Sequence, residues 1–141
     1  MSSNNRKKLL DMIRILFEKT DDEHYLDTYQ IIEELELLGH EKTDRKTIET
    51  SIKFMIEELG YGIEKEKGAP NRYRWVDRTF ELAELKLLVD AVQSCRFISD
   101  KKSKAIIDNL KSLTSAAKAE QLDRKIVTSN TFKRDNSSVL Y

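Results

Sequence analysis

The sequence has few of the residues that break or cross-link a chain: its 141 residues include one cysteine, one proline and four glycines. A single cysteine, Cys95, excludes an internal disulfide and is typical of proteins in a reducing cytoplasm. So few prolines and glycines allow few tight turns. Together with 35% charged residues, this indicates a soluble and largely helical protein.

Long apolar runs are also missing. No run approaches the roughly 20 residues that a membrane-spanning helix needs, and the polar start MSSNNRKK lacks the apolar core of a signal peptide. We therefore expect a cytoplasmic protein without membrane contact.

Signatures of catalysis are missing as well. The sequence has no glycine-rich phosphate loop, no nucleophile elbow and no convincing pair of carboxylates. His24 and His40 stand without the spacing of metal ligands. We expect no catalytic residue, no metal site and no cofactor, and hence no enzyme activity.

Charge of neither sign is in excess, since 25 Lys and Arg balance 25 Asp and Glu. Residues 1–78 are slightly acidic, with 14 basic and 17 acidic residues. Within them, Lys42–Lys53 has four bases and two acids, and Lys65–Arg74 has four bases and one acid. Because phosphate binding depends on the field at the docking face rather than on total charge, these two segments are candidates for nucleic-acid contact.

Apolar residues that recur at intervals of three and four predict two helices in the first forty residues. The first covers about residues 5–19. The second follows Asp27, an N-cap with Gln30 in capping-box position, and ends at Gly39. The buried stripes are expected at Leu9, Met12, Ile13, Leu16, Phe17, Ile31, Ile32, Leu35 and Leu38.

A third helix follows the turn GHEKTD, with Thr43 or Asp44 as its N-cap and Gly60 at its end. Its periodicity buries Ile48, Ile52, Met55, Ile56 and Leu59. The same periodicity directs Arg45, Lys46, Glu49, Thr50 and Lys53 outward.

Two strand-like runs come next, YGIEKEK and RYRWV, in which apolar and charged residues alternate. Gly68 and Pro70 mark the loop between them, and Tyr25 and Leu26 predict a further short strand before the second helix. Three helices followed by a basic hairpin predict a winged helix-turn-helix over residues 1–78.

Residues 79–124 predict a helical region. The segment 81–98 is apolar on more than one side, so we expect it to be buried against its own domain and against a second copy; burial wholly within the chain is the competing interpretation. Ser99 is expected to cap a further helix, and KAEQL extends or follows it. The expected dimer surface comprises Leu82, Leu85, Val89, Val92 and Phe97.

The last segment, residues 125–141, has strand propensity in KIVTSNTF, through Ile126, Val127, Thr128 and Phe132. The final SSVLY is expected to be the start of another element. The predicted fold class is thus mainly α with a small β-hairpin wing: a winged helix-turn-helix, a helical extension and a short β segment.

These segments resemble the amino-terminal part of bacterial transcriptional regulators that join a winged helix-turn-helix to a WYL domain. DRKTIETSI is similar to the family's recognition-helix start DRKTIYRDI, and FELAELKLLVDAVQSCRFI is similar to FTLxELKLLIDAVQSSRFI. The resemblance extends over nearly the whole chain from about Arg6. It implies a dimeric DNA-binding regulator whose ligand-sensing WYL domain, the part that would bind a ligand or nucleic acid, is absent.

The mechanism expected of such a chain places the third helix in the major groove of double-stranded DNA. Arg45 is the candidate for a bidentate guanine contact. Glu49, Thr50 and Ser51 stand where the family has YRD, and Glu49 either accepts from a cytosine amino group or repels phosphate. The full set of expected DNA-binding residues is Thr28, Tyr29, Lys42, Arg45, Lys46, Thr47, Glu49, Thr50, Lys53, Lys67, Arg72 and Arg74.

Three other interpretations compete with this one. The winged helix is a protein-docking module, or the chain is a short regulator that dimerises with a full-length relative and modulates it. Alternatively, the helical half forms a small-molecule pocket. The wing bases could also serve only to prevent edge-to-edge aggregation of the hairpin.

Overall fold

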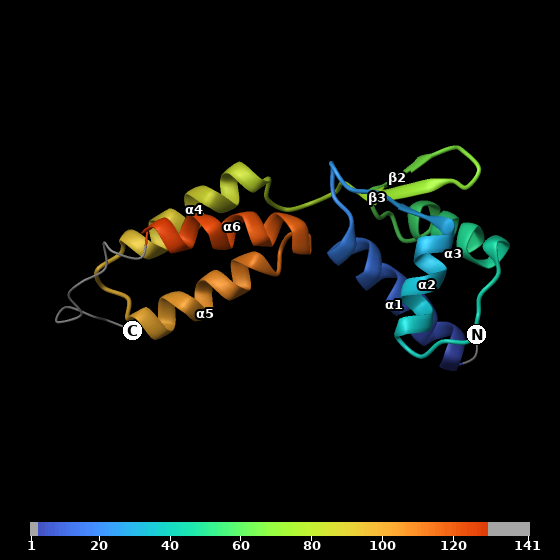
Figure 1. Cartoon of the computed structure of the whole chain (residues 1–141), viewed down its shortest axis with the longest axis horizontal. Coiled ribbons are helices and arrows are strands. Elements are labelled where there is room, and N and C mark those ends of the chain that lie inside the picture. Colours follow the sequence, from blue (N-terminus) through green and yellow to red (C-terminus); the bar gives the residue numbers. More distant parts are fainter. Residues whose placement is uncertain (1–2, 130–141) are drawn as a thin grey trace. The chain divides into compact units, whose positions relative to one another are not determined.

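The computed structural model describes residues 3–129, with side chains as far as Arg124. The chain divides into two compact units, Met1–Asp77 and Arg78–Tyr141, with the division one residue before the predicted boundary. The described part is mainly helical and contains one small three-stranded antiparallel sheet (Figure 1).

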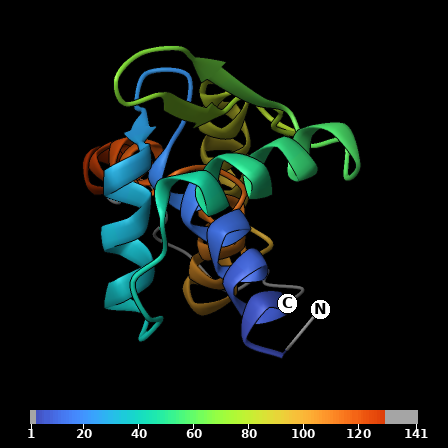
Figure 2. The ribbon, with the colours of Figure 1, turned by 90° about the vertical axis from the view of Figure 1, so that its right-hand side faces the viewer.

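The first unit has the element order of a winged helix-like fold. Its sheet order is β1-β3-β2, so the short first strand is added to the outer edge of the β2–β3 hairpin. All three helices of this unit lie on one side of the sheet (Figure 2). The elements are α1 (Ser3–Lys19), β1 (Leu26–Asp27), α2 (Thr28–Leu37), α3 (Arg45–Glu57), β2 (Ile63–Glu66) and β3 (Arg72–Trp75).

The predicted cap of the second helix is confirmed. The Asp27 carboxylate accepts from the Gln30 backbone N–H at 2.8 Å, and the Gln30 side chain accepts from the Asp27 N–H at 2.8 Å. Both bonds satisfy amide groups that the first helical turn leaves without intrahelical partners. At the other end of α2, Gly39 has a φ of 91°, which favours glycine because no Cβ then meets the backbone.

The core of the first unit follows the predicted stripes with three exceptions. Ile15 is buried although it lay outside the predicted stripe. Leu38 and Leu59 are 38% and 43% exposed, because α2 and α3 end before them and helical periodicity no longer applies. The buried cluster is Met12, Ile15, Leu16, Ile31, Ile32, Leu35, Ile48, Ile52, Met55, Ile63, Tyr73 and Trp75.

Trp75 joins the sheet to α1. Its ring meets Phe17 edge-on, with centroids 5.4 Å apart, and lies 4.9 Å from the ring of Tyr61. Its backbone N–H donates to the Thr20 hydroxyl at 2.8 Å. The prediction that Tyr73 and Trp75 are core residues is confirmed, since both are at least nine-tenths buried.

The second unit is a group of three helices, α4 (Leu82–Ser94), α5 (Asp100–Lys111) and α6 (Ala116–Ser129) (Figure 1). Ser99 caps α5 as predicted, with its hydroxyl accepting from the Lys102 N–H at 3.1 Å. Helix α4 contacts both of the others. The core cluster of this unit comprises Leu85, Val89, Ile107 and Leu122.

That core corrects the predicted dimer surface. Leu85 and Val89 are 0% exposed inside the second unit, and Leu82 and Val92 pack against the same cluster. The apolar stripe of α4 is therefore used for intramolecular packing with α5 and α6. Of the five residues expected at the dimer surface, Phe97 is the one that is largely exposed, at 53%.

The predicted strand at the end of the chain is wrong for its described part. Helix α6 continues through Ser129, so Ile126, Val127 and Thr128 are helical. Phe132 and the SSVLY segment lie outside the described residues. None of the helices between residues 3 and 129 has the length and apolarity to cross a bilayer.

Candidate nucleic-acid interface

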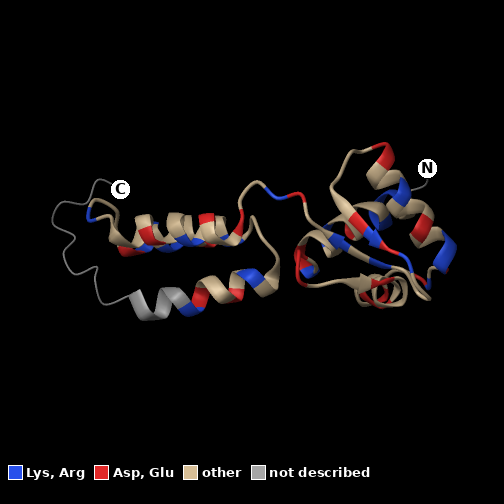
Figure 3. Cartoon of the chain, turned by 90° about the horizontal axis from the view of Figure 1, so that it is seen from above, with Lys and Arg blue, Asp and Glu red and all other residues tan. Residues whose placement is uncertain are grey.

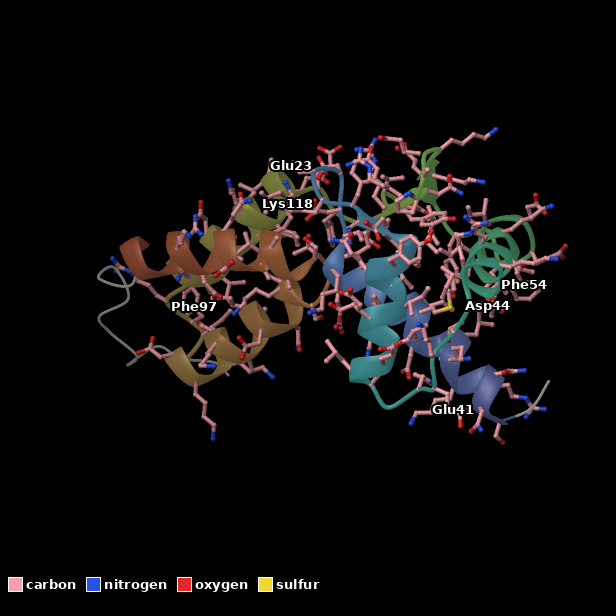
Figure 4. The ribbon with its side chains drawn as sticks, turned by 45° about the vertical axis from the view of Figure 1, so that its right-hand side comes forward. Glu23, Glu41, Asp44, Phe54, Phe97 and Lys118 are labelled. Carbon is pink, nitrogen blue, oxygen red and sulfur yellow. The ribbon has the colours of Figure 1, made fainter. Side chains whose placement is uncertain are left out.

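Helix α3 is fixed at its start by Asp44. The Asp44 carboxylate accepts from the Thr47 backbone N–H at 2.7 Å. The Thr47 side chain and this backbone hydrogen bond lower the pKa of Asp44. Figure 4 labels Asp44 at the start of the helix. The cap and the buried Ile48, Ile52 and Met55 together set which side of α3 faces water.

The outward side of α3 carries the predicted cationic residues. Figure 3 shows Lys and Arg interspersed with Asp and Glu in both units, so positive surface is local. Arg45 has a 64% exposed side chain, and Lys42 is exposed in the turn before the helix. The prediction that the outward side chains face water is confirmed for Arg45, Lys46, Thr50 and Lys53, with Thr47 also exposed and Glu49 half-buried.

A groove of about 520 Å³ runs between α3 and the hairpin. Lys46 and Lys53 line it from the helix, and Lys65 lines it from β2. Lys65 was not among the predicted contacts. Strand alternation could have identified it, because Lys65 is two residues after the buried Ile63 and therefore shares the face of β2 that looks toward α3.

Glu49 connects the helix to the hairpin. Its Oε1 accepts from the Asn71 side-chain amide at 3.4 Å and lies 3.9 Å from Nε of Arg45. The acid on the outward side of α3 thus has a structural partner. It also lines the groove together with the three lysines, where it reduces their positive field.

Asn71 makes further contacts that hold α2 and the wing turn in place. Its main-chain carbonyl accepts from the Thr28 N–H at 3.1 Å and from the Thr28 hydroxyl at 3.3 Å. Its side-chain oxygen accepts from the Gly68 N–H at 3.0 Å. Burial of the Tyr73 phenol raises the pKa of Tyr73, and the nearby Asn71 and Thr28 offset part of this effect.

These contacts correct one predicted DNA contact. Thr28 is 0% exposed, so its hydroxyl belongs to the junction of α2 and the hairpin and cannot meet a phosphate. The neighbouring Tyr29 is 54% exposed and stays available.

The arginines of the wing are also less available than predicted. Arg74 donates from Nε to Glu64 at 2.9 Å and from Nη1 to the carbonyl of Asp22 at 2.7 Å, and its bond to Glu64 raises the pKa of Arg74. Arg72 forms an ion pair with Glu66. We therefore assign Arg74 a structural role in holding the hairpin rather than a DNA contact. Lys67 at the turn is exposed as predicted.

Both arginines also lie over one aromatic ring. The guanidinium carbons of Arg72 and Arg74 are 4.3 and 4.8 Å from the ring centroid of Tyr25. Such stacking holds a guanidinium in place through the ring's quadrupole. On this face of the hairpin, Glu66 and Glu64 thus offset the charges of Arg72 and Arg74. The opposite face, which lines the groove and carries Lys65, is the more positively charged of the two.

Comparison of the chain with protein-family models, with curated proteins and with solved structures gives no match. Within residues 3–129, no group of three or more His, Cys, Asp or Glu is arranged to hold a metal ion.

Proposed function

We propose that this chain is a cytoplasmic transcriptional regulator that binds double-stranded DNA through α3. The observation that supports the proposal best is the groove between α3 and the hairpin, which three lysines line from both sides. Two acids, Glu49 and Glu57, also line the groove, so the lysines leave it with a small positive excess. An exposed, capped helix beside such a groove suits a duplex whose phosphates lie on both edges of the major groove.

The roles of the residues follow from their chemistry. Arg45, at the first position of the helix, suits a bidentate contact with guanine because its guanidinium is planar and exposed. Lys46, Lys53 and Lys65 suit phosphate contacts, which position the protein without reading sequence. The resemblance to WYL-associated regulators supports the same assignment for Arg45 and Lys46.

A homodimer is part of the proposal, since one winged helix with few base contacts needs a second to bind tightly. Two-fold related recognition helices would then contact half-sites about 34 Å apart. With Leu85 and Val89 in the core of the second unit, Phe97 is the remaining candidate for that contact.

Fluorescence anisotropy with labelled duplex DNA at low salt tests the function. We expect binding that weakens steeply between about 50 and 200 mM salt, because phosphate contacts release counterions. The Arg45→Glu/Lys46→Glu variant should abolish it. A matched control is Lys101→Glu/Lys102→Glu, which makes the same charge change at two exposed neighbours at the start of α5.

Undetectable binding at low salt to any random-sequence duplex would contradict the function. A winged helix that docks a protein is then the better interpretation. The paired charges on the outer face of the wing are the observation that favours this second candidate, since they reduce phosphate attraction there.

A further inference from the structure

Helix α3 has two exposed edges of different chemistry. Lys46 and Lys53 face the groove toward the hairpin. Thr47, Thr50 and Phe54 lie beside these lysines, at positions i, i+3 and i+7, which share one side of a helix, and Thr50 also lines the groove. We call these three uncharged side chains the methyl edge; its charged neighbours are Lys46 and Lys53 beside Thr50, and Glu58 one turn after Phe54.

One threonine hydroxyl of the methyl edge is used inside the helix. The Thr50 hydroxyl donates to the carbonyl of Lys46 at 2.8 Å, so its hydrogen is not left to donate to a base. The Thr47 side chain lies at the cap, where it lowers the pKa of Asp44. Both threonines are exposed and present a methyl group to water.

Phe54 completes the edge with an aromatic ring. The ring is 40% exposed (labelled in Figure 4), although the buried face of the same helix is occupied by Ile48, Ile52 and Met55. A phenylalanine on the outward side of a helix exposes apolar area that gains nothing from the fold. Its position, two turns after Thr47, suggests that the three side chains meet one ligand.

The chemistry of that ligand follows from the two edges together. The lysine edge complements phosphates, and the methyl edge offers mainly apolar contacts beside it. In the major groove, the apolar group that distinguishes one base pair from another is the 5-methyl of thymine, which pairs with threonine methyls and with phenylalanine.

Resting on the proposed DNA binding, we infer that α3 recognises thymine-rich sequence through the methyl edge of Thr47, Thr50 and Phe54. Thr47 and Phe54 are about 10 Å apart along the helix axis. In zinc fingers, a helix in the major groove contacts three successive bases with side chains spread over about seven residues. The thymines should therefore fall within about three or four adjacent base pairs.

The experiment uses the full chain and a random-sequence duplex pool. Selected duplexes should be enriched in neighbouring thymines. Each thymine is then replaced by deoxyuridine, which keeps the hydrogen bonds of the base and loses only the 5-methyl group. We expect the affinity to fall about fourfold for each methyl group that the edge contacts.

The Phe54→Ala variant should lose the discrimination between thymine and deoxyuridine at one position while binding the deoxyuridine duplex as the wild type does. Leu87→Ala, which shortens a 70% exposed leucine in the second unit, should keep the full discrimination. Circular dichroism checks that both variants are folded. If Phe54→Ala does not fold, the deoxyuridine series on the wild type still decides.

Equal affinity for thymine and deoxyuridine duplexes overturns the inference that the methyl edge recognises the 5-methyl group, and it leaves the proposed DNA binding intact. Retained discrimination in a folded Phe54→Ala overturns the role of Phe54. Absence of binding to every duplex at low salt overturns both the thymine recognition and the proposed DNA binding. Phe54 would then be a candidate protein contact.

Discussion

The side-chain amide of Asn71 lies 3.4 Å from the carboxylate of Glu49, and this contact joins the wing to the exposed helix. The same asparagine accepts from Thr28 at the start of α2 and from Gly68 in the wing turn. One residue therefore joins α2, α3 and the hairpin, and the last two border the groove. Because the groove is formed between α3 and the hairpin, its width depends on this junction.

Asn71→Ala should lower the free energy of unfolding by about 1 kcal/mol, the lower end for a lost partner, because Glu49 keeps some contact with water. Urea denaturation followed by circular dichroism measures it. Asn109→Ala on the exposed side of α5 is the control and should change stability by less than about 0.5 kcal/mol. Equal changes in the free energy of unfolding for the two substitutions would show that the contacts of Asn71 do not contribute to stability.

Glu49→Gln should separate the two roles of that acid. Glutamine keeps an oxygen that accepts from Asn71, so stability should change by less than about 0.5 kcal/mol. Loss of the negative charge beside Lys46 and Lys53 should raise DNA affinity about fivefold, from about 1 kcal/mol for a unit charge in water. Glu120→Gln, on an exposed side of α6, gives the same charge change as a control. A weakened preference for cytosine instead would mean that Glu49 reads a base.

Much of the first unit could be predicted from short-range signals. The capping box of Asp27 and Gln30, the cap at Asp44 and the alternation around Tyr73 and Trp75 depend on residues close in sequence, and all are observed. The predicted secondary structure was wrong where the intrinsic preference of a segment differs from the element that it forms in the folded chain. Residues 126–128 have β-branched side chains that favour strands, yet they continue a helix that begins at Ala116.

The candidate site was predictable only in part, for a related reason. Exposure of Arg45, Lys46 and Lys53 follows from helical periodicity. The burial of Thr28 and the pairing of Arg74 with Glu64 depend on contacts 43 and 10 residues apart in the chain. The apolar stripe of α4 correctly predicted that this side of the helix is buried. Periodicity alone cannot tell whether α5 and α6 or a second copy of the chain covers it.

Lys65→Ala should reduce the dependence of DNA binding on salt. Removing one phosphate contact lowers the slope of log K against log salt concentration by about 0.9. Arg72→Ala should change that slope much less, because Glu66 already offsets the charge of Arg72 on the other face of the hairpin. Anisotropy titrations at four or five salt concentrations compare the two. A larger effect of Arg72→Ala would assign phosphate contact to the outer face of the wing.

Leu85→Ala and Leu87→Ala should distinguish the core of the second unit from its surface. Leu85 is 0% exposed, so its truncation should destabilise this unit by about 2–5 kcal/mol through lost burial and a cavity. Leu87 is 70% exposed, and its truncation should cost less than about 0.5 kcal/mol. Thermal unfolding measures both. Comparable small effects, together with a shift from dimer to monomer in sedimentation for Leu85→Ala, would restore Leu85 to an intermolecular interface.

Stability at low pH should depend on the cap of α3. The pKa of Asp44 is lowered in the folded chain, chiefly by the Thr47 side chain and by the Thr47 backbone N–H. The ionised carboxylate therefore stabilises the fold at pH values above the unfolded-state pKa, and this contribution is lost as the pH falls through the lower folded-state value. In Asp44→Asn the cap is kept and the titration is removed. The advantage of the wild type over Asp44→Asn should be constant above about pH 5 and should shrink below about pH 4.

Thr47→Val tests the cause of that pH dependence. It removes the side-chain hydroxyl, which lowers the pKa most, and leaves the backbone N–H that donates to Asp44. The loss of stability between pH 5 and pH 2 should therefore be smaller in Thr47→Val than in the wild type, as measured by urea denaturation at several pH values. An unchanged pH profile would mean that the Thr47 hydroxyl does not bond to Asp44. That hydroxyl would then be free to donate to a base, and the methyl edge would lose one of its three members.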